Sequence, residues 1–134
     1  MKVCLGCGSP LSKRSQKVYC GNACQALARR ETRTKRWLES GEAWIGTRQD
    51  HYIRQYLAAA QSHCCAICGT ASTWNGLPLT FVLDHIDGDP TNNRRENLRL
   101  VCPNCDSQLP TYKSRNRGNG RHYRRRRYAD GQSY

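Results

Sequence analysis

An Asp-His pair at the end of an apolar run is the clearest candidate for chemistry in this sequence. Asp84 and His85 directly follow the apolar run at residues 77–83. They belong to the stretch FVLDHIDGDPTNNRRENLRLVCPNCDSQ, which is residues 81–108. A histidine beside a carboxylate can act as a general base near neutral pH and take a proton from water, provided that a metal ion holds the scissile phosphate. The plainer interpretation is a buried structural histidine, with Asp84 capping a turn.

Cysteine pairs supply a second possible chemistry. Eight of the nine cysteines fall into two sets of close pairs, namely Cys4, Cys7, Cys20 and Cys24, then Cys65, Cys68, Cys102 and Cys105. A tetrahedral Zn²⁺ about 2.3 Å from each thiolate needs two such pairs, so each set predicts one structural zinc ion. A redox CxxC motif is the alternative for the first set, but no βαβ pattern surrounds it. Cys64 with Cys68 would also be an acceptable spacing, although CxxC geometry favours Cys65.

Length and charge limit the kind of protein this can be. The 134 residues suffice for one compact domain or two very small ones, and an apolar content of 37% gives a marginal core that metal ions would have to brace. The net charge of +12 points to a polyanion, most simply nucleic acid. Half of the acidic residues lie within residues 81–108, between basic flanks at 13–36 and 107–134. This distribution predicts a cation site inside a phosphate-binding surface.

The chain has no targeting or membrane signal that we can recognise. No apolar leader follows Met1, and no apolar run approaches the length that spans a bilayer. We therefore expect a cytoplasmic protein without a membrane partner, either associated with the nucleoid or encoded by a phage and made in the host cytoplasm. A reducing compartment also favours zinc over disulfides for the paired cysteines.

Four segments follow from the spacing of motifs and breaks. We expect a four-Cys zinc finger at 1–30, a helical connector at 31–62 with a break at Ser40-Gly41, a core at 63–117 and a basic arm at 118–134. Within the core, residues 77–83 and 98–101 predict two strands. Pro103 suits the first turn of a helix, which Pro110 would end after about two turns.

The combination of LDH, ENL and CPNC resembles the HNH endonuclease family over residues 65–116. In that family an Asp-His ends the first strand, an Asn precedes the second strand, and a third residue follows the CPNC knuckle in many zinc-braced members. The resemblance implies the ββα-metal fold within a small, zinc-stabilised α+β protein. The N-terminal four-Cys segment looks like the accessory zinc finger of some small phage and bacterial members.

The resemblance also assigns roles to individual residues. His85 would activate water, Asn97 would tie the loop so that the imidazole is aimed, and Asp84 would bind one divalent cation. The third position departs from the family, because Asp106 stands where His or Asn is usual. Two carboxylates favour Mg²⁺ or Mn²⁺ over metals that prefer imidazole. We therefore expect a DNA endonuclease that depends on one of these two metals.

Basic residues around this stretch are the expected contacts to DNA phosphates: Arg94, Arg95, Arg99, Lys113, Arg115, Arg117, Arg124, Arg125, Arg126 and Arg127. One alternative is a non-catalytic, zinc-dependent nucleic-acid-binding protein with a degenerate HNH site. Another is a nuclease directed to RNA or to a nucleic-acid structure, because phosphate chemistry does not select the sugar. Oligomeric state, and nicking as against double-strand cleavage, stay open at this point.

Overall fold

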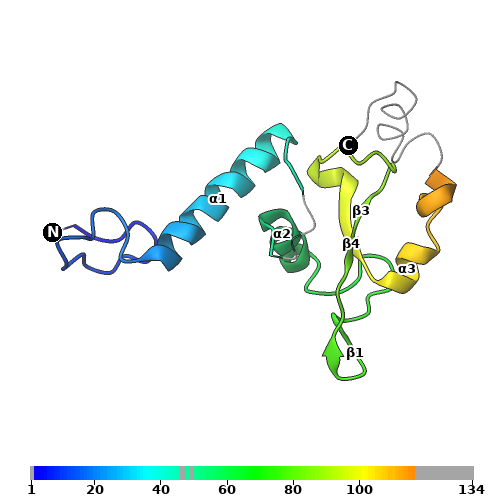
Figure 1. Cartoon of the computed structure of the whole chain (residues 1–134), viewed down its shortest axis with the longest axis horizontal. Helices are drawn as coiled ribbons and strands as arrows, with labels where there is room; N and C mark the ends of the chain where they lie inside the picture. The colour runs from blue at the N-terminus through cyan, green and yellow to red at the C-terminus, as the bar shows by residue number, and fades with distance from the viewer. Residues whose placement is uncertain (1, 46–47, 49, 117–134) are drawn as a thin grey trace, which may run out of the picture.

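Three α-helices and two antiparallel two-stranded sheets make up the part of the chain described by the computed structural model, which is residues 2–45, 48 and 50–116. The N-terminal cysteine module lies at one end, a long helix leads away from it, and the other elements form a body around the second sheet (Figure 1). No helix within the described ranges is long and apolar enough to cross a bilayer. The chain is a small α+β protein.

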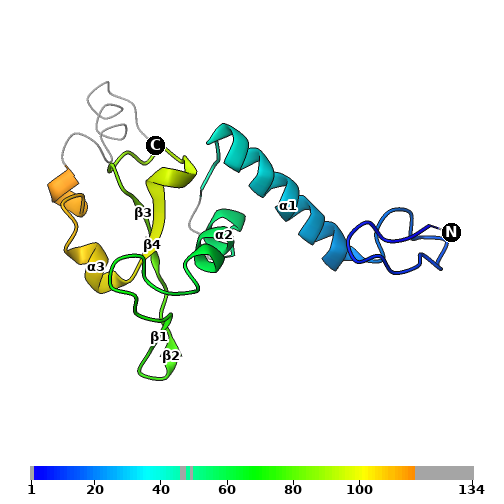
Figure 2. The same ribbon diagram turned by 180° about the vertical axis from the view of Figure 1, so that it is seen from behind.

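Helix α1 (Asn22–Ser40) joins the N-terminal module to the body (Figures 1 and 2). It passes through residues 30 and 31 without interruption, so the expected zinc finger and connector share one helix. The predicted break at Ser40-Gly41 is confirmed: Gly41 has φ 70°, and its N–H donates to the carbonyl of Trp37 at 2.7 Å. A left-handed residue of this kind is a common helix end and favours glycine.

Helix α2 (Tyr52–Ala60) supplies one wall of the core. The Nδ1 atom of His51 accepts the N–H of Ile53 and caps the helix. Ile53 and Leu57 are fully buried and pack with Trp37, whose side chain closes the end of α1 onto the body. The core continues into Phe81, Leu98, Leu100, Val101 and Leu109.

The prediction of one strand over residues 77–83 is wrong, because two separate strands occupy this region. Strand β1 (Thr73–Trp74) pairs with β2 (Leu77–Pro78) in a short hairpin. Asn75 and Gly76 form its turn with φ values of 50° and 73°, and two positive φ values with an Asn-Gly sequence are typical of a type I′ hairpin. The chain then leaves this hairpin and forms a new strand at Val82.

Strands β3 (Val82–His85) and β4 (Leu98–Val101) form the second sheet. Asp84 lies opposite Arg99 and His85 opposite Leu98 in its register, and a 3₁₀ turn, Arg95–Asn97, leads into β4. The second predicted strand is thus confirmed.

Helix α3 (Pro103–Ser107) begins where predicted but is shorter than the two turns expected, ending three residues before Pro110. A further 3₁₀ turn, Lys113–Asn116, follows it. In both views α2 and α3 lie on opposite sides of the β3–β4 pair (Figures 1 and 2). The strand pair that carries the predicted chemistry therefore has α3 on one side and α2 on the other.

Candidate active site and metal centres

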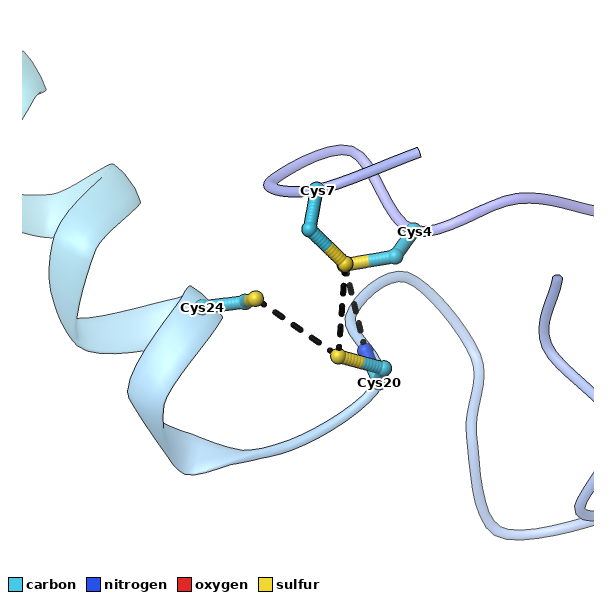
Figure 3. Close-up of side chains that lie close together, drawn as sticks. All are labelled: Cys4, Cys7, Cys20 and Cys24. Atoms are coloured by element: carbon cyan, nitrogen blue, oxygen red, sulfur yellow. Dashed lines mark hydrogen bonds between the residues drawn. The ribbon is translucent and has the colours of Figure 1, made fainter. Parts of the chain in front are cut away.

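The four N-terminal cysteines converge on one point (Figure 3). The Sγ atoms of Cys7 and Cys20 are 3.7 Å apart, those of Cys20 and Cys24 are 3.5 Å apart, and all four lie within 4.8 Å of one another. In a tetrahedron with metal–sulfur bonds of about 2.3 Å, the sulfurs are about 3.8 Å apart. The spacing therefore fits a single tetrahedral ion held between the Cys4 turn and the start of α1.

The second cysteine set has the same geometry in the body. Its four Sγ atoms also lie within 4.8 Å of one another, with 3.7 Å between Cys68 and Cys102. Cys65 belongs to this set, whereas the Sγ of Cys64 is directed to the carbonyl of Ser62 at 3.4 Å. The set joins the turn at residues 65–68 to the first turn of α3, so an ion here would fix that helix against the sheet.

Backbone N–H groups prepare one thiol of each set to be a thiolate. Burial alone would raise the pKa of Cys4, but N–H groups of Cys20, Cys7 and Gly6 lower it to about 6. Burial would also raise the pKa of Cys65, but hydrogen bonds from backbone N–H groups outweigh this effect and lower the pKa to about 6. The neighbouring thiols raise the pKa of Cys24 to about 12, and burial followed by the neighbouring thiols does the same for Cys105. Four ionised thiols can coexist in each set only when a cation binds among them.

His85, the last residue of β3, is held by an asparagine that the sequence did not single out. Its Nε2 lies 2.7 Å from Oδ1 of Asn93. The Nδ2 of Asn93 donates to the carbonyl of Ala43 at 3.0 Å, which fixes the amide orientation and leaves Oδ1 as an acceptor. The proton of a neutral imidazole must then lie on Nε2, so Nδ1 is the nitrogen free to accept a proton.

Asn93 is itself fixed by the end of α1. Only 9% of its surface is exposed, and its backbone carbonyl accepts the indole N–H of Trp37 at 2.6 Å. The partners of Asn93 lie 50 and 56 residues earlier in the chain. No local signal in the sequence could therefore have found this contact.

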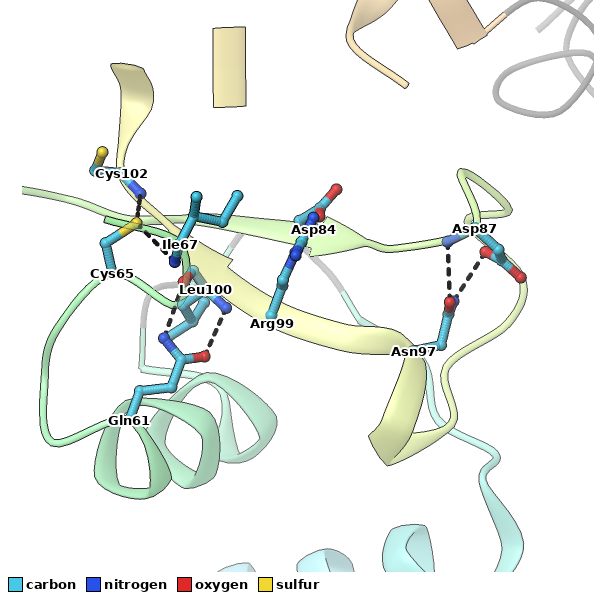
Figure 4. A network of polar contacts seen from close by, with 9 residues as sticks. All are labelled: Gln61, Cys65, Ile67, Asp84, Asp87, Asn97, Arg99, Leu100 and Cys102. Atoms are coloured by element: carbon cyan, nitrogen blue, oxygen red, sulfur yellow. Dashed lines mark hydrogen bonds and ion pairs between the residues drawn. The ribbon is translucent and has the colours of Figure 1, made fainter. Parts of the chain in front are cut away.

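Asn97 closes the loop that follows β3 (Figure 4). Its Oδ1 accepts the N–H of Asp87 at 3.0 Å, and its Nδ2 donates to Oδ1 of Asp87 at 2.9 Å and to the carbonyl of Asn92 at 2.8 Å. Hydrogen bonds from Asn92 and the Asp89 backbone are the main reason that the pKa of Asp87 lies below its ordinary value. Asn97 thus shapes the loop, while the direct contact with the imidazole comes from Asn93.

Asp84 is buried, with 7% of its surface exposed, and pairs with a cation of the opposite strand (Figure 4). The Nε of Arg99 lies 2.7 Å from its Oδ2. Burial, and then the charge of Asp84, raises the pKa of Asp106 above its ordinary value, with Lys113 opposing. The charge of Asp84 therefore acts on Asp106, while Arg99 pairs with Asp84 across the sheet.

Asp84 and Asp106 do not belong to a complete ligand set within the described residues. Within the described part of the chain, only the two cysteine sets bring three or more Cys, His, Asp or Glu ligand atoms within 4.8 Å of one another. Two hard oxygen donors suit Mg²⁺ or Mn²⁺, which usually keep several water ligands. The residue types of Asp84 and Asp106 are thus compatible with such an ion, whose other ligands would be water and phosphate.

Residues 74–104 match a family model described as HNH endonuclease. This part of the chain is similar to HNH endonucleases. The H-N-H endonuclease F-TflIV of Escherichia phage T5 is 43% identical over 56 residues, which is 42% of this chain and 24% of the phage protein. The match thus spans about a quarter of the length of this curated relative, and no solved structure matches the chain.

The matched HNH segment contains Asp84, His85 and Asn97 but ends before Asp106. Asp106 lies on α3, directly after Cys105, which is a member of the second cysteine set. The position that departs from the family in sequence is therefore also outside the region that the family model covers.

The residues expected to contact DNA differ in their surroundings. Arg94, Lys113 and Arg115 are exposed, and the guanidinium of Arg95 lies over the ring of Tyr56 at 5.4 Å. Arg99 stands apart because its Nε is engaged by Asp84. Arg117, Arg124, Arg125, Arg126 and Arg127, and with them the basic arm at 118–134, lie outside the described residues.

Proposed function

We propose that the chain is a metal-dependent HNH endonuclease that hydrolyses phosphodiester bonds of DNA in the cytoplasm of a cell or of a phage-infected host. The observation that carries this proposal is the end of β3, where Nε2 of His85 is held by Asn93 and Nδ1 has no hydrogen-bond partner among the described residues. His85 lies in the segment matched by the HNH family, one residue from a buried carboxylate. This arrangement combines a general base with a cation ligand.

The proposed chemistry begins at Nδ1 of His85, which takes a proton from the attacking water. Because Nε2 donates to Asn93, the positive charge that develops on the ring stays hydrogen-bonded throughout. Asn97 holds the loop between β3 and β4 closed, so that Asn93 keeps its place beside the ring. In this scheme Asn93 and Asn97 are positioning residues, and His85 alone moves a proton.

Asp84 and Asp106 would hold the divalent cation, Mg²⁺ or Mn²⁺. When bound, such an ion neutralises the charge of the scissile phosphate and of the departing oxygen. Oδ2 of Asp84 is engaged by Arg99, which leaves Oδ1 as the donor. Asp106 must lose its proton before it can bind, and its raised pKa makes the neutral form more common when no cation is present.

Each cysteine set would hold one structural zinc ion, giving two zinc ions per chain. The first would make residues 1–30 a folded finger at the tip of α1, with residues 31–62 as connector. The second would brace the core at 63–117 and hold α3, which carries Asp106, against β3. Arg94, Arg95, Lys113 and Arg115, with the arginines of the arm at 118–134, are proposed to contact DNA phosphates.

A second candidate is a nucleic-acid-binding protein with an inactive HNH site. The ion pair between Asp84 and Arg99 favours it, because an arginine already balances one of the two carboxylates proposed for the cation. The third, a nuclease directed to RNA or to branched DNA, uses the same site on another substrate.

Cleavage of supercoiled plasmid separates these candidates. Wild-type protein with its zinc retained is incubated with Mg²⁺ or Mn²⁺, with EDTA added in a parallel reaction. Single-stranded RNA and branched DNA are included as competing substrates. Nicked or linear plasmid only in the presence of the divalent ion supports the endonuclease. An intact plasmid under every metal, with the protein still bound to DNA, supports the binding protein, and preferential loss of a competitor supports the third candidate.

A further inference from the structure

A hollow of about 410 Å³ lies outside the proposed active site, between α1 and the segment that leads into α2. Its lining combines cationic and aromatic side chains with one acid: Arg33, Arg36, Trp44, His51, Tyr52 and Glu42, above the buried Trp37. The volume is in the range of small-ligand sites. None of the six is used by the proposed chemistry.

A solvent-exposed tryptophan lines the aromatic side of the hollow. Trp44 is 89% exposed, the most exposed of the large apolar side chains in the described residues. Its backbone is anchored, because its carbonyl lies 3.0 Å from Nε2 of His51, whose ring stacks on Tyr52 with 4.4 Å between centroids. An indole with a free face on an anchored backbone is suited to stacking on a flat partner.

The opposite side carries unbalanced positive charge. Arg33 and Arg36 have no ion-pair partner among the described residues. The nearby Asp50 is already engaged by Arg48, with 2.8 Å between Nη2 and Oδ2. Burial raises the pKa of Tyr52 and the charges of Arg33 and Arg36 oppose it, so both guanidinium groups act on the hollow. An anionic group would be favoured there.

We propose that this hollow binds one unpaired nucleotide of a single-stranded nucleic-acid segment. Its base would stack on Trp44, and its phosphate would lie against Arg33 and Arg36. A flat base joined to a phosphate matches an exposed indole beside two arginines, as in proteins that bind single strands by stacking and backbone charge. Glu42 offers an acceptor to an exocyclic amino group. The site does not require the chain to cleave what it binds.

Fluorescence anisotropy tests the proposal with the zinc-loaded full chain and no added Mg²⁺ or Mn²⁺. The probes are a labelled single-stranded 12-mer of deoxythymidine and a blunt 16-base-pair duplex. Trp44→Ala should weaken single-strand binding by about fivefold or more, the loss expected for one stacked base, and change duplex binding by less than about twofold. Trp44→Phe, which keeps an aromatic face, should restore most of the loss.

Trp74→Ala is the matched control, because Trp74 is also well exposed but lies in the distant β1–β2 hairpin. It should leave both affinities within about twofold. Arg36→Gln should remove about one phosphate contact, so that the plot of log affinity for the single strand against log salt concentration becomes less steep by the amount expected for one contact. The proposal is overturned if Trp44→Ala binds the single strand within twofold of wild type, or if it loses duplex binding to the same extent. Plasmid cleavage by the wild type is a separate readout, so neither result decides the endonuclease proposal.

Discussion

The imidazole of His85 and the side-chain amide of Asn93 are joined by a 2.7 Å hydrogen bond, and the amide is held in turn by the carbonyl of Ala43. The last residue of β3 is thereby connected to the segment that follows α1. This connection fixes which imidazole nitrogen can accept a proton. It makes the N-terminal helix part of the support for the proposed base.

Replacing Asn93 by Ala should release the ring without removing the base. Because Nε2 loses its acceptor, the neutral ring should populate both tautomers, and the cleavage rate should fall about 10- to 100-fold, as for other residues that orient a functional side chain. The ¹⁵N shifts of His85 measure the tautomer independently of activity. Asn92→Ala is the matched control, since Asn92 contacts Asp87 and not the ring. An unchanged tautomer in Asn93→Ala would remove the assigned role.

Removing one exposed cysteine from each set should remove one zinc ion at a time. Cys7→Ala and Cys68→Ala should each lower the zinc content by about one ion per chain, because three thiolates no longer close the tetrahedron. Cys64→Ala should leave it unchanged, since its sulfur lies outside the second set. Elemental analysis of purified protein gives the count. A wild-type content near zero, or equal contents in all four proteins, would contradict the proposed centres.

The two ion pairs of the described structure should differ in their contribution to stability. Arg99→Gln leaves the buried Asp84 without its cation, so we expect a loss of about 2 kcal/mol in the free energy of unfolding. Arg48→Gln breaks an exposed pair, with side chains 79% and 63% exposed, and should change stability by less than about 0.5 kcal/mol. Urea titrations in zinc-containing buffer compare them. Equal losses would show that Asp84 does not depend on Arg99.

Much of this arrangement could be predicted from local sequence, and part of it could not. The cysteine spacings, the β4 strand and the start of α3 at Pro103 follow from short-range patterns. The pairing of Asp84 with Arg99 depends on the register between two strands joined by a 12-residue loop, which no turn motif fixes. The apolar run at 77–83 favoured one continuous strand, although the Asn75-Gly76 turn directly before it pairs residues 77–78 with β1 in a hairpin.

Asp106 should make the stability of the metal-free site depend on pH with a definite sign. Its pKa is raised by burial and by Asp84, so the folded state favours the protonated form. The stability associated with it is present at low pH and is lost as pH rises from its ordinary value of 3.8 through the raised value. Asp106→Asn should therefore become more stable relative to wild type as pH rises.

Urea unfolding of both proteins between about pH 4.5 and 7.5, without added Mg²⁺ or Mn²⁺, measures this difference. Taking the difference cancels the opposite contribution of Asp87, whose pKa is lowered. Added Mg²⁺ should then stabilise the wild type at neutral pH more than Asp106→Asn. A difference that stays flat with pH, or that grows toward acid, would contradict the raised pKa of Asp106.

The rate of plasmid cleavage by His85→Ala tests the central claim most directly. Wild type, His85→Ala and the control His63→Asn, which keeps a residue tolerant of the positive φ at that position, are compared under single-turnover conditions with Mg²⁺ or Mn²⁺. Their zinc contents should be equal. We predict cleavage by wild type and His63→Asn and a loss of at least about 100-fold in His85→Ala. Cleavage by His85→Ala at the wild-type rate would contradict the assignment of His85 as the base.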